Sequence, residues 1–522
     1  MKSEDEVVTN VLIPIWNTKR TVIHPALNID KEKVLLSQFM IYLDGETEKE
    51  YLTLIGSDKK FCIIKEEEDF TKNNYKPLYF PNKLDNRWSP DSIKHFLNGS
   101  CPVVTMKDTF ETVKAEIKEY IDLPDDRMYD FMACWIIGTY FHPMFNSFPY
   151  VYLNAMKRSG KTKLLTLAYC MAFNAKFTLS LTPATLFRLV QGNRCTIVMD
   201  EEEKLNDKDK IEYRSLLLGG YKKGMKVPRA QEGKKKSFEV NEYEVYSPKI
   251  MANISGIEDV LEDRCITLIL LRTLSVGLAN REIDINDEKW QMVRDKLYVN
   301  LMVNYNAVIR SYGLLSDHFS SVGSVGCEGS VGTMGVRGLL INNDMSIIHE
   351  SPTHPTLTTL GKLKTIRARD LELWMPILAI GMTVDDTIFN NLVDFALKNI
   401  AEKETESVTE SNDSVLIESL IDIVKDDDYI STRDLIDKIA NYLDIDIKDK
   451  NNGWLNGVWL GRAMKRLGFV NKRRVARGVE YRLAPESVKN IAMRAKVGLD
   501  KYVKQKTLEV NQNDNNESIQ KP

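Results

Sequence analysis

Cysteine and histidine are scarce in this chain of 522 residues. The seven cysteines are widely spaced and never form a C-x-x-C pair, and the six histidines are scattered as well. No cysteine–histidine group has the spacing of zinc ligands, so we expect no structural zinc. An odd number of separated cysteines is typical of a reducing compartment, and we expect a cytoplasmic location.

Long apolar runs are also lacking. No stretch of about 18 residues is free of charge and proline, which predicts a protein that does not span a membrane. The chain opens with Met1, Lys2 and then acidic residues, without the apolar segment of a secretory signal, so we expect none.

Charge of one sign is missing overall but concentrated locally. The formal net charge is −3, yet residues 461–506 hold 14 Lys or Arg against 3 Asp or Glu, and residues 402–428 are rich in acids. One basic end in a nearly neutral chain favours a local anion-binding surface, with nucleic acid as the obvious partner.

Length and local patterns together predict several domains. We expect a β-rich or α+β accessory domain (1–95), a helical collar (96–146), an α/β core (147–275), a helical region (276–400) with a Ser/Val/Gly-rich insertion (320–335), an acidic linker (401–413), a helix-and-hairpin domain (414–485), and a basic, then disordered tail (486–522). The insertion is either a contact loop or, as we favour, a tolerated insertion.

The centre of the chain alternates apolar strands with helices. Strands are predicted at 148–153, 196–199, 249–252 and 266–271, with helices at 161–173 and after Thr182-Pro183, which is typical of an N-cap and first-turn proline. Continuously apolar strands separated by helices indicate a parallel sheet covered on both faces.

A glycine-lysine-threonine triplet follows the first of these strands and opens a helix. Phosphate binding needs backbone N–H groups, a lysine for the β- and γ-phosphates and a hydroxyl for Mg²⁺. These groups are supplied by Ala155, Met156, Lys157, Arg158, Ser159, Gly160, Lys161 and Thr162. Only Ala155 departs from the pattern G-x-x-x-x-G-K-[ST]. The segment predicts a P-loop that binds ATP; the alternative is a lysine-rich turn.

Acidic residues follow the second strand. Asp200 is expected to hold Mg²⁺ together with Thr162, and Glu201 to polarise the attacking water. Glu202 and Glu203 are interpreted as solvated acids at a helix start. A P-loop followed by carboxylates at a strand end predicts ATP hydrolysis with Mg²⁺ as cofactor.

Two further positions fit a hydrolysis site. Asn253 ends the third strand and can orient the water or the γ-phosphate, although asparagine is also common in turns. Arg264 precedes the last strand; in a ring ATPase such an arginine reaches the nucleotide of the neighbouring subunit. The alternative for Arg264 is a surface arginine paired with Glu262 or Asp263.

The motifs in this order resemble an AAA+ family of replicative helicase-like ATPases of mobile genetic elements (cassette-chromosome, phage and plasmid type) related to MCM helicases. The resemblance extends over about residues 125–400 and rests on the P-loop, Asp200-Glu201 and the segments 181–190, 219–224, 262–266 and 374–380. It implies an AAA+ P-loop NTPase core with an α-helical lid, a homo-oligomeric ring, most simply a hexamer, and Arg369 as the sensor 2 arginine, with Arg367 as competitor.

The resemblance also implies a basic hairpin that contacts single-stranded DNA in the ring channel. The candidate residues come before a segment, 238–246, in which apolar and charged residues alternate. They are Lys222, Lys223, Lys226, Arg229, Lys234, Lys235 and Lys236. The alternative is a solvated basic loop.

The C-terminal region has the element order of a winged helix. Helices are predicted at 415–424, 431–442 and 455–467, followed by a hairpin at 469–483. Its candidate contacts to duplex DNA are Arg462, Lys465, Arg466, Lys472, Arg473, Arg474 and Arg477. Trp454 and Trp459 are expected to pack in the core. Winged helices also dock proteins, so this alternative stays open.

The sequence therefore predicts an ATP-dependent DNA helicase or translocase. Two alternatives remain: a regulatory or loader ATPase that binds DNA without unwinding it, and a defence or signalling NTPase whose winged helix docks a protein.

Overall fold

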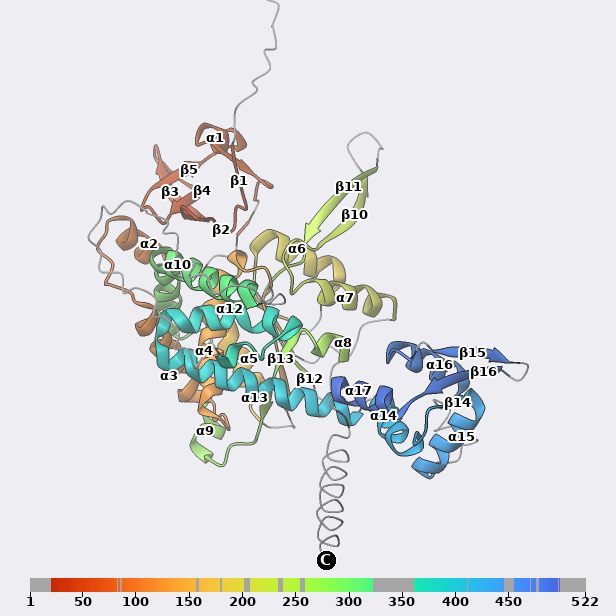
Figure 1. Ribbon diagram of the computed structural model, residues 1–522. Coiled ribbons are helices and arrows are strands. Elements are labelled where there is room, and N and C mark those ends of the chain that lie inside the picture. The colour runs from red at the N-terminus through yellow and green to blue at the C-terminus, as the bar shows by residue number, and fades with distance from the viewer. Residues whose placement is uncertain are drawn as a thin grey trace, which may run out of the picture. The chain divides into compact units, whose positions relative to one another are not determined.

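The computed structural model of the chain describes residues 20–81, 83–84, 87–155, 159–178, 181–200, 207–232, 238–253, 259–322, 361–410, 412–445, 455–469, 471–475, 478–495 and 497. They belong to two compact units, Met1–Leu397 and Lys398–Pro522 (Figure 1). No helix in these ranges is long and apolar enough to cross a bilayer.

The N-terminal part of the first unit is a small α+β domain. An antiparallel sheet has the order β2 (Asn28–Ile29), β3 (Val34–Asp44), β4 (Thr47–Gly56) and β5 (Phe61–Ile64), while β1 (Thr21–Ile23) pairs in parallel with β6 (Tyr75–Pro77) and α1 spans Glu67–Lys72. Its core includes Leu35, Leu54 and Phe70. Strands and helices therefore occupy the described part of the predicted accessory domain (1–95), of which residues 1–19 lie outside the described residues.

Helices follow this domain, and each begins at a polar cap. Ser89, Thr105 and Asp125 are the N-caps of α2 (Pro90–Leu97), α3 (Met106–Tyr120) and α4 (Asp126–Phe141), and a short 3-10 helix, η1 (His142–Met144), ends the run. All residues of α4 from Met128 onward are buried, because α4 packs against α3 and against later helices of the same unit. Helices α3 and α4 therefore lie within the region 96–146 that was predicted to be helical.

A five-stranded parallel sheet forms the centre of the first unit. Its order is β13 (Cys265–Leu270), β7 (Tyr150–Ala155), β12 (Lys249–Asn253), β9 (Ile197–Asp200) and β8 (Lys176–Thr178). All four predicted strands are present, and β8 is one that the sequence analysis missed. Helix α5 (Lys161–Met171) packs on β9 and β12, so the helix that begins at Lys161 is anchored to the sheet.

The connections between these strands carry the other predicted elements. Thr182 caps α6 (Pro183–Asn193), with Pro183 in its first turn as predicted. Between α7 (Asp207–Gly219) and β12 lies an antiparallel hairpin, β10 (Lys226–Glu232) and β11 (Phe238–Glu244); the short helices α8 (Asp259–Glu262) and α9 (Val276–Asn280) flank β13.

Long helices complete the first unit and lead into the second. Helix α10 runs from Glu288 to Val322, and α12 (Ala368–Val384) packs against α10 and α4. The Ser/Val/Gly tract from residue 323 onward lies outside the described residues. Helix α13 spans Asp386–Glu410, so the predicted linker at 401–413 is wrong for most of its length. Good helix formers and the i,i+4 pair Lys398–Glu402, 3.9 Å apart, favour the helix there.

The second unit has three predicted helices, α14 (Asn412–Ile423), α15 (Thr432–Leu443) and α16 (Gly457–Arg466), and a three-stranded sheet of order β14 (Asp428–Ser431), β16 (Gly478–Leu483), β15 (Lys472–Val475). Ser431 is the N-cap of α15, and its side chain accepts a hydrogen bond from the N–H of Asp434. Trp459 packs against the core of the unit, whereas Trp454 lies outside the described residues. A further helix, α17 (Pro485–Ala495), occupies the first, basic part of the predicted tail, because Val488 and Ala492 are buried in that core.

Candidate active site

The predicted phosphate loop connects strand β7 to helix α5. Ala155 is the last residue of β7; Met156, Lys157 and Arg158 lie outside the described residues. Ser159 and Lys161 are buried, with 8% and 7% of their surfaces exposed.

Gly160 sets the geometry at the start of α5. Its φ of 89° is in the left-handed region, which costs any residue with a Cβ. A Cβ on Gly160 would also approach Ile121 Cδ1 to 3.3 Å. The glycine of the triplet is therefore required by the backbone, and the N–H groups of the first helical turn follow it.

The structure brings the helix start and the carboxylate strand into contact. Thr162 Oγ1 donates a hydrogen bond to Asp200 Oδ2 at 3.1 Å, although 38 residues separate the two along the chain. Asp200 is the last residue of β9, and its neighbours Glu201, Glu202 and Glu203 lie outside the described residues. A hydroxyl and a carboxylate thus meet beside the first turn of α5.

Strand β12 runs between the two motif strands. Asn253 pairs with Asn154 of β7, and Ala252 pairs with Asp200 of β9. Because the three strands are parallel, Ala155, Asn253 and Asp200 end at the same edge of the sheet, where ligands of open α/β sheets bind. The backbone of Asn253 is described, but its side chain is not.

Arg264 lies at the opposite edge of this sheet. Its carbonyl accepts a hydrogen bond from the N–H of Tyr150, the first residue of β7. Five strand steps of about 3.3 Å put roughly 16 Å between this edge and the phosphate loop of the same chain. Arg264 Nε donates to the Leu218 carbonyl at 3.1 Å, its Nη1 donates to the Val260 carbonyl, and the guanidinium is 3.8 Å from Asp263.

Arg369 joins Arg264 at that edge. Its Nη1 donates to the Tyr221 hydroxyl at 2.6 Å, and its Nε is 3.8 Å from the same Asp263 carboxylate. The guanidinium groups of Arg369 and Arg264 lie 4.9 and 5.8 Å from the centre of the Tyr221 ring. Arg367, the alternative candidate for the sensor 2 arginine, is the N-cap of α12 and is exposed. The sequence analysis missed this role of Tyr221, although it had singled out the segment 219–224.

The described basic residues of the hairpin region all have partners within the chain. Lys222 Nζ donates to Glu372 Oε1 at 2.9 Å, and this hydrogen bond raises the pKa of Lys222. Lys223 Nζ donates to the Pro143 carbonyl at 2.6 Å, while burial lowers its pKa.

Two further hairpin cations pair with acids. Lys226 Nζ donates to Glu242 Oε2 across the hairpin at 2.8 Å, and Arg229 donates to Glu212 while its guanidinium lies 5.1 Å from the Phe187 ring centre. The predicted Lys234, Lys235 and Lys236 lie outside the described residues. The positive charges of Lys226 and Arg229 are therefore balanced by acidic side chains of the same chain.

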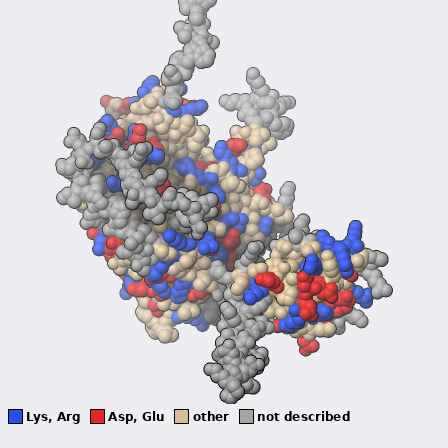
Figure 2. Space-filling view, viewed as in Figure 1, with Lys and Arg blue, Asp and Glu red and all other residues tan. Residues whose placement is uncertain are grey.

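The basic residues of the second unit differ among themselves. Arg473 donates to Glu480 at 2.7 Å and lies 3.9 Å from the Tyr429 ring centre, whereas Lys472 and Arg474 are exposed on the same strand. Figure 2 shows Lys and Arg over strands β15 and β16 and a separate group of Asp and Glu on the same unit. The side chains of Arg462, Lys465, Arg466 and Arg477 lie outside the described residues.

Comparison with known proteins gives weak structural similarity and no match in sequence. No family model matches the chain, and no curated protein matches it. A solved structure described as the A form apo structure of the NrS-1 C-terminal region, residues 305–718, is similar over 85% of this chain and 96% of its own, with 10% sequence identity. Its TM-score of 0.30 is too low to support an assignment.

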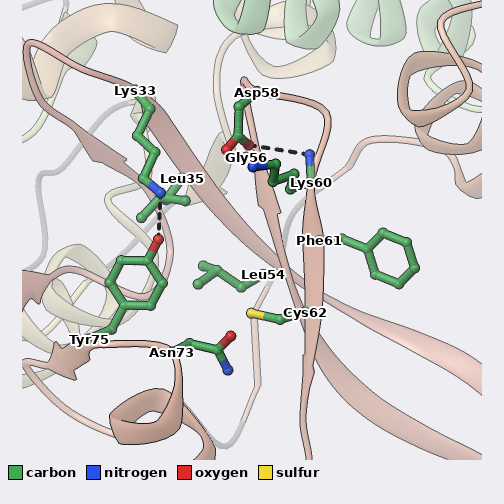
Figure 3. Close-up of a pocket in the computed structure, with 10 residues that line it drawn as sticks. All are labelled: Lys33, Leu35, Leu54, Gly56, Asp58, Lys60, Phe61, Cys62, Asn73 and Tyr75. Carbon is green, nitrogen blue, oxygen red and sulfur yellow. Dashed lines mark hydrogen bonds between the residues drawn. The ribbon is translucent and has the colours of Figure 1, made fainter.

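A separate cavity of about 210 Å³ lies in the N-terminal domain (Figure 3). Lys33 Nζ donates to the Tyr75 hydroxyl at 2.6 Å, and both residues line the cavity. Burial is the largest influence and lowers the pKa of Lys33, but the hydrogen bond to Tyr75 and the charge interactions with Tyr75, Asp58 and Asp30 together outweigh it, and the pKa is raised. The lining, which also includes Cys62 and Asn73, shares no residue with the nucleotide motifs.

Proposed function

We propose that this chain is a Mg²⁺-dependent ATPase of the AAA+ type that moves along DNA. The observation that carries the proposal is the 3.1 Å hydrogen bond from Thr162 to Asp200, beside the left-handed Gly160 that opens α5. It joins the two segments that a P-loop ATPase needs together, at the sheet edge where such ligands bind.

The residues at this edge fit a nucleotide with its magnesium ion. Hydroxyl and carboxylate oxygens are the ligands that Mg²⁺ prefers, and Thr162 and Asp200 supply one of each. When bound, the ion would neutralise phosphate charge. The N–H groups that begin α5 would cradle the phosphates, and Lys161 would contact the β- and γ-phosphates. Glu201 would polarise water and Asn253 would orient it, both from the ends of adjacent strands.

Arg264 and Arg369 fit the nucleotide of a neighbouring copy. Both lie at the sheet edge opposite to the phosphate loop of their own chain, held to Tyr221 and Asp263. A head-to-tail interface would place this edge against the next copy's phosphate loop, and repetition of that contact closes a ring, most simply a hexamer. The helices α10, α12 and α13 would then be the lid of the AAA+ core.

DNA is the proposed track. The β10–β11 hairpin would contact single-stranded DNA in the channel, and the second unit, as a winged helix, would contact duplex through α16 and β15. Exposed Lys472 and Arg474 support the second contact.

Replacing Thr162 tests the ATPase site. Thr162→Ala removes the hydroxyl that meets Asp200, and we expect Mg²⁺-dependent ATP hydrolysis to fall by about 100-fold or more. Thr166→Ala is the matched control, because the Thr166 hydroxyl donates to the Thr162 carbonyl at 2.8 Å one turn further along α5. Equal rates of phosphate release by the two variants would refute the site.

A regulatory or loader ATPase is the second candidate. It is favoured by the intramolecular partners of Lys222, Lys223, Lys226 and Arg229, which reduce the charge available to a translocating strand. Strand displacement on forked DNA, with ATP and with a non-hydrolysable analogue, separates the two: displacement only with ATP supports the motor, and DNA binding without displacement supports the loader.

A signalling or defence NTPase with a protein-docking winged helix is favoured by the acids that neutralise Arg473 and Arg482. Filter binding of DNA against salt decides this point. Phosphate contacts predict a steep loss of affinity with salt, and an absence of DNA binding at low salt would favour protein docking.

A further inference from the structure

We propose that Tyr221 is a positioning residue that holds Arg264 and Arg369 as a pair for a neighbouring copy's nucleotide. The inference rests on the proposed function and adds to it the residue that aligns the two arginines. Tyr221 belongs to the connection between α7 and β10, only 5% of its surface is exposed, and neither the P-loop nor the carboxylate strand of its own chain contains it.

Two like charges need a common support to lie together. The guanidinium groups of Arg264 and Arg369 would repel each other, yet they lie 5.8 and 4.9 Å from the Tyr221 ring centre and both approach the Asp263 carboxylate to 3.8 Å. An aromatic face attracts a guanidinium, and a shared carboxylate offsets the repulsion. The ring and Asp263 therefore act on both arginines, which come from segments far apart in the sequence.

The Tyr221 hydroxyl adds direction to this support. It accepts from Arg369 Nη1 at 2.6 Å and donates to Glu372 Oε2 at 3.4 Å. Arg369 and Glu372 lie three residues apart on α12, so the hydroxyl contacts one face of the first turns of that helix. The orientation of Arg369 thus depends on the hydroxyl and on the ring.

Close packing and a backbone hydrogen bond hold the backbone at Tyr221 in place. A Cβ on Gly220 would lie 2.5 Å from the Val245 carbonyl oxygen and 2.9 Å from the Leu216 carbonyl oxygen, so only glycine allows this approach. The Tyr221 carbonyl accepts from the N–H of Phe148 at 2.8 Å, just before β7. A residue so held can fix the position of a side chain that must meet another molecule.

The segment that contains Tyr221 leads directly into the β10–β11 hairpin. Lys222, the next residue, donates to the other oxygen of Glu372, and β10 begins four residues later. Helix α12 therefore contacts both Tyr221, which supports the arginines, and Lys222, just before the hairpin. The support of the arginine pair and the start of the hairpin thus belong to one short segment of the chain.

Two substitutions at Tyr221 test the inference in the full-length chain. Tyr221→Phe removes only the hydroxyl, and Tyr221→Leu also removes the ring. We expect kcat for ATP hydrolysis to fall about tenfold in Tyr221→Phe and further in Tyr221→Leu, with KM for ATP within about twofold, because each copy's own phosphate site is untouched. Tyr312→Phe is the control. It removes a hydroxyl that accepts a hydrogen bond from the N–H of Asn146, and it should hydrolyse ATP normally.

Mixing subunits gives a readout that a merely structural role would not move. Lys161→Ala copies carry intact arginines and a defective phosphate site, whereas Tyr221→Leu copies carry the reverse. An equimolar mixture should therefore hydrolyse ATP several-fold faster than the sum of the two separate proteins at the same total concentration. Thermal unfolding of both variants, and ATP binding by Tyr221→Leu, show whether the variants are folded.

The outcomes separate this inference from the function on which it rests. Absence of ATP hydrolysis by the unaltered chain overturns the proposed function itself. Normal hydrolysis by the unaltered chain with an unchanged kcat in Tyr221→Phe, or a mixture no more active than its parts, overturns the role of Tyr221. Because Tyr221→Phe keeps the buried ring, its result decides the question even if Tyr221→Leu does not fold.

Discussion

Gly160 combines two constraints that a single substitution can measure. Its φ of 89° and the 3.3 Å that would separate an added Cβ from Ile121 Cδ1 both oppose a side chain. We expect Gly160→Ala to lower the free energy of unfolding by about 1–2 kcal/mol and to weaken ATP binding. Gly192→Ala is the control, since a Cβ there meets nothing within 4 Å and alanine favours the helix; it should be neutral or stabilising by up to about 1 kcal/mol. Equal Tm values would contradict the account.

Lys249 predicts a pH dependence of stability. Its side chain is fully buried at the start of β12, and burial lowers its pKa to about 7, although its Nζ donates to two oxygens of Ser247. Between this pKa and the ordinary value of 10.5, the unfolded chain binds a proton that the folded chain lacks. The free energy of unfolding from this group therefore rises with pH above about 7, by at most about 1.4 kcal/mol per pH unit.

Lys249→Met isolates that contribution. Urea unfolding between about pH 7 and about pH 9.5 should show a shallower rise for Lys249→Met than for the unaltered chain, since methionine has no proton to bind. Parallel curves for the two proteins would show that Lys249 does not titrate in this range.

Single residues also show what a sequence can and cannot reveal. Thr162 and Asp200 could be paired in advance because each lies in a motif at a strand end, and parallel strands end at one edge. Tyr221 could not, because its contacts with Arg264 and Arg369 depend on how α12 packs against the α7–β10 connection. The segment 219–224 was a signal of importance, but nothing in it indicated two arginine partners.

In the β10–β11 hairpin a single substitution can remove the acidic partner of an exposed lysine. Lys226 is paired with Glu242 across the two strands at 2.8 Å, and both side chains are exposed. We expect Glu242→Gln to free Lys226 and raise the affinity for single-stranded DNA about three- to tenfold at low salt, because one phosphate contact is gained and one repulsion is lost.

Glu48→Gln, which removes an equally exposed acid from β4, is the matched control for net charge. Fluorescence anisotropy with a labelled oligonucleotide at two salt concentrations measures both variants. If Glu242→Gln and Glu48→Gln bind DNA alike, the hairpin is not the DNA contact.

Element types were easier to predict than element ends and sheet order. The central strands are continuously apolar, so their existence followed from sequence, but the insertion of β12 between β7 and β9 depends on tertiary packing. The acidic segment after Ile400 suggested a linker by composition, whereas Ala401 and the Lys398–Glu402 pair extend α13. Helix α17 was missed because its positive charge suggested a tail, although Val488 and Ala492 already had helical spacing.

For the whole molecule, the strongest argument for an assembly is that the predicted phosphate loop and the arginine pair lie at opposite edges of the central sheet. Each chain would complete its neighbour's site, so activity should depend on protein concentration through assembly. Particle images with nucleotide bound would show whether copies form closed rings.

The central claim is that a nucleotide with Mg²⁺ binds where Thr162 meets Asp200, and calorimetric titration of ATP with and without Mg²⁺ tests it most directly. The account predicts that Mg²⁺ strengthens ATP binding by the unaltered chain and that Asp200→Asn loses this Mg²⁺ effect. No uptake of ATP by the unaltered chain, or an Asp200→Asn variant with the same Mg²⁺ dependence, would contradict it.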